Sequence, residues 1–116
     1  MFAVKRVYDP PSPDDGARIL VDRLWPRGLT KEAAALDDWV KEVAPSNELR
    51  KWFHAHVERW DEFLARYAKE LEKPPAQEAM TALRARGKRG RVTLLFSSKE
   101  ADRNNATALA AFLADV

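Results

Sequence analysis

Residues 91–97, with the sequence RVTLLFS, give the clearest indication of the fold. The run is short and almost wholly apolar, and polar residues follow it, which is typical of a strand that is buried on both faces of a sheet. Residues 17–24, with the sequence ARILVDRL, repeat this pattern and end at Trp25 and Pro26. Two such strands predict a sheet that other elements cover on both sides.

Residues 2–7 alternate apolar and basic side chains, which predicts a third, half-exposed strand. Three prolines and a glycine in residues 9–16 predict a loop after it. This loop is long enough for a wide hairpin and short for a crossover connection, so the direction of the first strand stays open.

Helical patterns fill most of the remaining chain. Thr30 is predicted to cap a first helix, and Ser46 or Asn47 to cap a second. The second helix has a broad apolar stripe, because its apolar residues recur at spacings of three and four. The helices are expected, in order, over residues 31–43, 49–71, 76–86 and 102–113.

Strands interleaved with helices predict an α/β fold. We expect a small three- to four-stranded sheet, largely parallel, that about four helices cover. The length of 116 residues is typical of one compact domain, so residues 1–116 are predicted to form a single domain.

Composition excludes several kinds of protein. The chain contains no cysteine, which rules out disulfides, thiolate nucleophiles and zinc–cysteine clusters. Twenty lysines and arginines against eighteen acidic residues give a net charge of +2, too small to imply nucleic-acid binding by itself. No apolar run resembles a signal peptide or approaches the roughly 20 residues that cross a bilayer. A cytoplasmic protein that binds no membrane is therefore expected.

The candidate site lies where the two buried strands end. Residues 22–28 follow one strand and residues 97–105 follow the other, and ligands of open α/β sheets bind at the carboxyl ends of the strands. The two stretches supply cations, a carboxylate and a flat aromatic surface: Arg23, Arg27, Lys99 and Arg103, with Asp22 and Trp25. This collection predicts a cleft for an anionic, phosphate-bearing ligand, such as a nucleotide, a sugar phosphate or an unpaired nucleic-acid strand.

Other interpretations of these residues stay open. Asp22 would pair with an arginine at a strand end, and Trp25 would fill the edge of the core. Residues 84–91 carry five basic and no acidic side chains, which suits a nucleic-acid-binding module and also a solvated loop. A hydrolase or transferase acting on the same ligand needs a base, for which Asp22 is the candidate. An exposed tryptophan surface for a protein partner is a further alternative.

Neither a metal site nor a cofactor is predicted. His54 and His56 lie two residues apart on one helix and point to different sides, with no third ligand evident. The chain has no glycine-rich phosphate loop, and no Gly-x-Ser-x-Gly motif surrounds Ser97. Three tryptophans fall on apolar stripes and are predicted to lie in the core: Trp39, Trp52 and Trp60. Trp52 and Phe53 stand near the start of a helix, where an aromatic side chain could also line a cleft.

Five segments resemble the YeaO-like branch of domain-of-unknown-function family 488. They are residues 6–10, 22–28, 36–39, 44–53 and 92–99. The resemblance covers nearly the whole chain at consistent spacing, and the block VDRLWPRG at residues 21–28 is highly specific. It implies a small cytoplasmic protein of bacteria or archaea with no assigned reaction.

The family pattern also marks where this chain departs from it. Phe96 stands where the wider family has cysteine in many members. Lys99 and Asn104 match the YeaO-like pattern, so Asn104 joins the candidate ligand contacts, whereas Asn105 replaces a histidine. If that histidine performs acid–base chemistry in other members, this chain lacks it, which argues against an enzyme.

Overall fold

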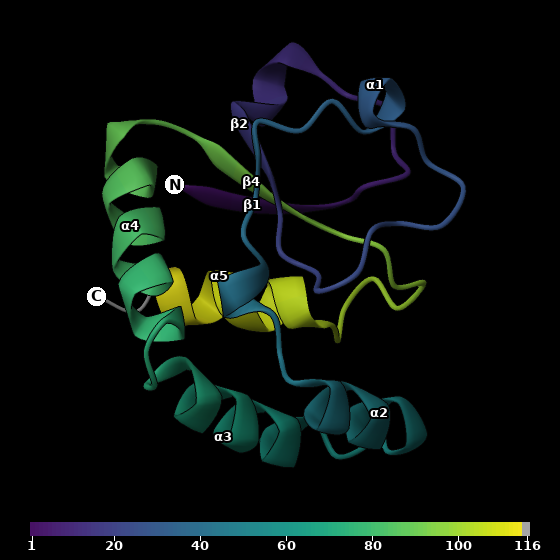
Figure 1. Ribbon diagram of the computed structural model, residues 1–116, viewed down its shortest axis with the longest axis vertical. Helices are drawn as coiled ribbons and strands as arrows, with labels where there is room; N and C mark the ends of the chain where they lie inside the picture. The colour runs from purple at the N-terminus through teal and green to yellow at the C-terminus, as the bar shows by residue number, and fades with distance from the viewer. Residues whose placement is uncertain (115–116) are drawn as a thin grey trace.

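The computed structural model describes residues 1–114 and has an α/β fold, as predicted (Figure 1). Its sheet has four parallel strands in the order β1-β4-β2-β3. They are β1 (Phe2–Arg6), β2 (Ala17–Leu20), β3 (Asp38–Trp39) and β4 (Val92–Phe96). The first strand, whose direction the sequence left open, is therefore parallel to the others and pairs with β4.

Five α-helices accompany the sheet. They are α1 (Lys31–Ala34), α2 (Asn47–Ala55), α3 (Trp60–Leu71), α4 (Ala76–Arg89) and α5 (Asn105–Ala114). Two 3-10 turns, Pro13–Asp15 and Lys41–Val43, complete the regular structure of the described residues. The predicted caps are present, because the side chain of Thr30 accepts a hydrogen bond from the Ala33 amide and that of Ser46 from the Leu49 amide. None of the described helices is both long and apolar enough to traverse a bilayer.

The prediction of a helix from Lys31 to about Val43 is wrong beyond Ala34. Ala35 adopts a left-handed conformation with φ of 49°, which ends α1 after one turn. The following residues pair with β2 instead, since Asp37 donates its amide to the Arg18 carbonyl at 2.8 Å and accepts the Arg18 amide on its carboxylate at 2.7 Å. Pairing along the sheet edge thus outweighs the helix propensity of the alanine-rich segment.

The single long helix predicted over residues 49–71 is likewise wrong, because the chain breaks between α2 and α3. The break lets α3 fold back beside α2 and brings their aromatic rings together. Phe53 stacks on Phe63 with 4.3 Å between ring centroids, and Trp60 lies 5.6 Å from Phe53. This buried aromatic contact favours two packed helices over one continuous helix.

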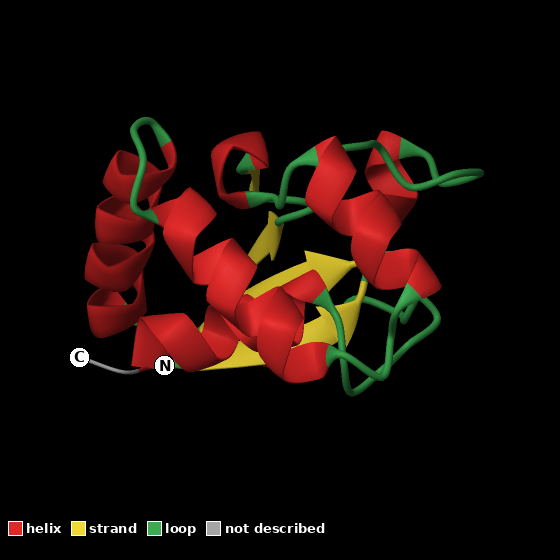
Figure 2. Ribbon diagram, turned by 90° about the horizontal axis from the view of Figure 1, so that it is seen from below, coloured by secondary structure: helices red, strands yellow, loops and turns green. Residues whose placement is uncertain are grey.

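The strands carry a core on each face of the sheet. Ile19, Leu94 and Phe96 belong to the larger cluster, which the helices α2 to α5 cover. Leu20 and Leu95 point the other way into a smaller cluster, which Ala34 and the residues after β2 close. Figure 2 looks from the helical side and shows the helices in front of the strands. The sheet is therefore buried on both faces, as the apolar runs indicated.

Candidate functional site

A cleft of about 850 Å³ lies at the carboxyl ends of the strands. Each of its main lining segments follows a strand or covers its end: Tyr8 after β1, residues 22–27 after β2, residues 44–45 after β3, residues 97–105 after β4, and part of α2. In Figure 1 the connections after β1, β2 and β4 lie to the right of the sheet. The six ligand contacts predicted from the sequence all line this one cleft: Asp22, Arg23, Trp25, Arg27, Lys99 and Asn104.

Asp22 joins the ends of two strands and the start of α5. Its carboxylate accepts hydrogen bonds from the Ser97 amide at 2.9 Å, from the Ser97 hydroxyl at 2.7 Å and from the Asn105 side-chain amide at 2.9 Å. None of these partners is an arginine, so the predicted arginine pair does not form. The carboxylate is instead held by neutral donors, and it fixes the two halves of the cleft relative to each other.

Arg23 is hydrogen-bonded to the segment before α2, and Trp25 to its own loop. The Arg23 guanidinium donates to the carbonyls of Ala44 and Pro45, at 3.3 Å each. The Trp25 indole donates to the Leu29 carbonyl at 2.7 Å and packs edge-on against Trp39, 5.4 Å away between centroids. Both side chains therefore shape the cleft walls as well as lining them, and Trp25 also closes the smaller core cluster.

Asn104 is buried and its polar atoms are already used. Its amide group donates to the carbonyls of Glu100 and Ala101, and its side-chain oxygen accepts the Thr107 amide at 2.9 Å. The residue thus caps the start of α5. Its side chain lies at the cleft wall, where its hydrogen bonds stabilise the start of α5.

Four further cations stand exposed around the cleft. They are Arg27, Arg50, Lys99 and Arg103. Within residues 1–114 none of them forms an ion pair, whereas five other cations of this part of the chain do. Exposed cations without carboxylate partners leave a positive potential at the cleft, which attracts anions.

Sequence reasoning missed the contribution of α2 to this site. Arg50 and His54 lie one helical turn apart and both line the cleft. Phe53 lines it as well, which is the outcome considered for the aromatic pair at this position, whereas Trp52 packs against Arg66. The four-residue spacing was visible in the sequence, but nothing local indicated that α2 faces the strand ends.

Apolar surface is also gathered at the cleft. Among residues 1–114 the large apolar side chains that stand exposed are Met1, Tyr8, Leu24 and Val57. The last three all line the cleft, with exposed fractions of 39%, 60% and 40%. The cleft therefore combines unpaired cations with exposed apolar side chains.

The basic segment of residues 84–91 lies at the other end of the sheet. It forms the end of α4 and leads into the start of β4, while the cleft begins where β4 ends. Five residues of strand separate the two regions, or roughly 17 Å. Arg86 also faces Asp38, at 3.7 Å.

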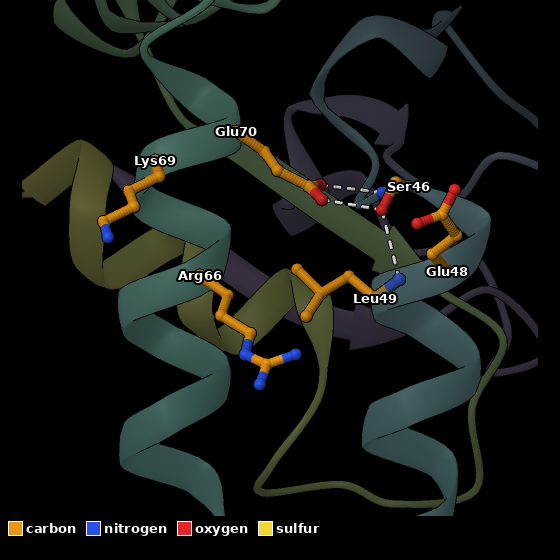
Figure 3. A pocket seen from close by; sticks show the side chains of 6 residues that line it. All are labelled: Ser46, Glu48, Leu49, Arg66, Lys69 and Glu70. Atoms are coloured by element: carbon orange, nitrogen blue, oxygen red, sulfur yellow. Dashed lines mark hydrogen bonds between the residues drawn. The ribbon is translucent and has the colours of Figure 1, made fainter.

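Side chains of α2 and α3 line a second, smaller hollow between the two helices (Figure 3). The Glu70 carboxylate accepts the Ser46 amide at 2.8 Å and the Ser46 hydroxyl at 2.6 Å. This carboxylate satisfies both donors of Ser46, the residue that caps the start of α2. The hydrogen bonds between Ser46 and Glu70 therefore hold α2 and α3 together beside this hollow.

The whole chain, residues 1–116, matches the protein family described as the inactive DUF488-N3 subclade, and the chain belongs to this family. The uncharacterized protein YeaO of Escherichia coli is 48% identical over 109 residues, which cover 94% of this chain and 93% of YeaO. Uncharacterized proteins of Mycobacterium tuberculosis and Mycobacterium bovis are 44% identical over 110 residues, which cover 95% of this chain and 91% of theirs. The family resemblance in the sequence is thereby confirmed. No solved structure matches the chain.

Proposed function

We propose that this protein binds an anionic, phosphate-bearing ligand, such as a nucleotide, in the cleft at the carboxyl ends of its strands. The observation that carries the proposal is the set of exposed cations without ion-pair partners among residues 1–114: Arg27, Arg50, Lys99 and Arg103. They come from three separate segments and surround one cleft. Guanidinium groups suit phosphate oxygens because their donors match them two at a time.

Binding without chemistry fits the site better than catalysis. Asp22, the candidate base, already accepts three hydrogen bonds from Ser97 and Asn105. Its neighbour Asn105 carries an amide, which takes no proton at neutral pH and so does not serve as a general acid or base. The family's description as an inactive subclade agrees with this proposal.

A nucleic acid is the less favoured ligand. Residues 84–91 and the cleft lie at opposite ends of β4, so one strand of phosphates would have to pass along the sheet to touch both. The cleft by itself is the size of a small-molecule site, since such sites span roughly 300–1,000 Å³.

Calorimetry with ADP as the probe tests the proposal. The double variant Arg27→Ala/Arg50→Ala removes two cleft cations, and we expect it to bind ADP at least about tenfold more weakly than the native protein. Lys88→Ala/Arg89→Ala is the matched control, since it removes two exposed cations of α4 that lie outside the cleft. Native-like ADP binding by the first variant, or equal loss in both, contradicts the proposal.

A further inference from the structure

We infer that the ligand of this cleft is an organic diphosphate, a compound that joins about three negative charges to an apolar or aromatic body. The inference rests on the proposed function and narrows it. Two independent features of the cleft carry it, the balance of charges along its walls and the exposed apolar side chains beside them.

The charges that line the cleft leave an excess of three positive charges. Five cations line it: Arg23, Arg27, Arg50, Lys99 and Arg103. Only two carboxylates do so, Asp22 and Glu100, and His54 is counted as neutral. A phosphate monoester carries about −1.5 to −2 at neutral pH, so a diphosphate carries about −3 and balances this excess better.

The positions of the cations also favour an extended anion over a compact one. Arg23 and Arg27 follow β2, Arg50 belongs to α2, and Lys99 and Arg103 follow β4. Two linked phosphates present more oxygen atoms to cations from separate segments than a single phosphate group does.

The apolar side chains indicate that the ligand has a body besides its phosphates. Leu24 and Val57 are 60% and 40% exposed, and they come from the loop after β2 and from the chain just after α2. Tyr8 adds a partly exposed aromatic ring from a third segment. Covering such surface favours binding of an apolar or planar group, which inorganic phosphates lack. A nucleoside and an isoprenyl chain both supply such a body.

The test compares four probes by calorimetry: ADP, AMP, geranyl diphosphate and inorganic pyrophosphate. We expect at least one of the organic diphosphates to bind about tenfold more tightly than pyrophosphate, and ADP to bind more tightly than AMP. Which organic diphosphate binds more tightly then distinguishes a nucleoside body from an isoprenyl one.

Two variants test separately how the cleft binds the apolar body of the ligand and how it binds the phosphates. Leu24→Ser/Val57→Ser should weaken binding of the preferred organic diphosphate about tenfold and leave the affinity for pyrophosphate unchanged. Arg50→Ala should weaken binding of both ligands. Leu24, Val57 and Arg50 are all exposed, so we expect the variants to fold. An unchanged thermal unfolding midpoint without ligand checks this.

The outcomes also distinguish this inference from the proposed function. Equal affinity for pyrophosphate and both organic diphosphates, equal affinity for AMP and ADP, or no effect of Leu24→Ser/Val57→Ser overturns the inference and leaves anion binding standing. Failure of all four probes to bind overturns both.

Discussion

The side-chain amide of Asn105 lies 2.9 Å from the Asp22 carboxylate and 3.1 Å from the Val21 carbonyl. One side chain at the start of α5 thus holds the end of β2, across 83 residues of sequence. The contact connects the two loops that carry most of the cleft cations. It also occupies the carboxylate that would otherwise be the base of the site.

Replacing Asn105 with alanine should therefore destabilise the fold. The Asp22 carboxylate would keep the two Ser97 donors and lose the third, so we expect the free energy of unfolding to fall by about 1–3 kcal/mol. Urea denaturation measures this change. Asn47→Ala is the matched control, because Asn47 is exposed at the start of α2, and a loss as large there would show that Asn105 has no special role.

Tyr67 provides a second test of a buried polar contact. Its hydroxyl donates to the Val43 carbonyl and lies in a fully buried position, where burial raises the pKa of the phenol above its ordinary value. Tyr67→Phe leaves that carbonyl without its donor, so unfolding should become easier by about 1–3 kcal/mol. Tyr8→Phe removes an exposed hydroxyl bonded to the Arg27 carbonyl and should cost much less. Equal losses in the two variants would contradict this account.

Gly16 is expected to tolerate no side chain. Its φ of +63° is unfavourable for other residues, and a Cβ atom there would lie 2.2 Å from the Arg91 carbonyl oxygen. Gly16→Ala should lower the free energy of unfolding by at least about 2 kcal/mol. Gly90→Ala is the control, since a Cβ there meets open space and its backbone is extended. Thermal and urea unfolding of both variants measure the difference, and similar midpoints would refute the argument.

Acid should weaken the fold through Asp15. Burial raises the pKa of its carboxyl group, but hydrogen bonds from Ser12, Lys5 and Arg18 outweigh this effect and hold the pKa below its ordinary value of 3.8. A group with a lowered pKa in the folded state stabilises the protein at higher pH. The contribution is complete well above pH 3.8 and is lost as the pH falls through the folded-state pKa.

Urea midpoints measured from pH 7 down to pH 2 test this prediction. Asp15→Asn should be less stable at neutral pH and should show a shallower loss below about pH 3.8 than the native protein. Asp14→Asn is the control at the neighbouring, exposed carboxyl group, and it should keep the native slope. If the urea midpoint of Asp15→Asn falls with pH as steeply as that of the native protein, groups other than Asp15 cause the acid sensitivity.

The central strands and the helix caps could be predicted from the sequence, whereas β3 and the break between α2 and α3 could not. β2 and β4 are recognisable as continuous apolar runs because both faces of each strand are buried. β3 is only two residues long and follows an alanine-rich segment, so nothing local signals its pairing with β2. The break between α2 and α3 could not be predicted either, because apolar residues continue across it at the helical spacing of three and four.

The six predicted contacts share one cleft because parallel strands bring their carboxyl ends to the same edge. Their role in ligand binding remains a prediction. Arg50 and His54 were not predicted to line the cleft, because their place in it depends on how α2 packs on the sheet, which is a property of the tertiary structure.

The most direct test of ligand binding in this cleft is an NMR titration of the labelled protein with ADP. We predict that the amide signals of residues 22–28 and 97–105 shift together and saturate, while those of residues 84–91 stay in place. Absence of saturable shifts in the two cleft segments with both ADP and geranyl diphosphate, or shifts confined to residues 84–91, would contradict the account.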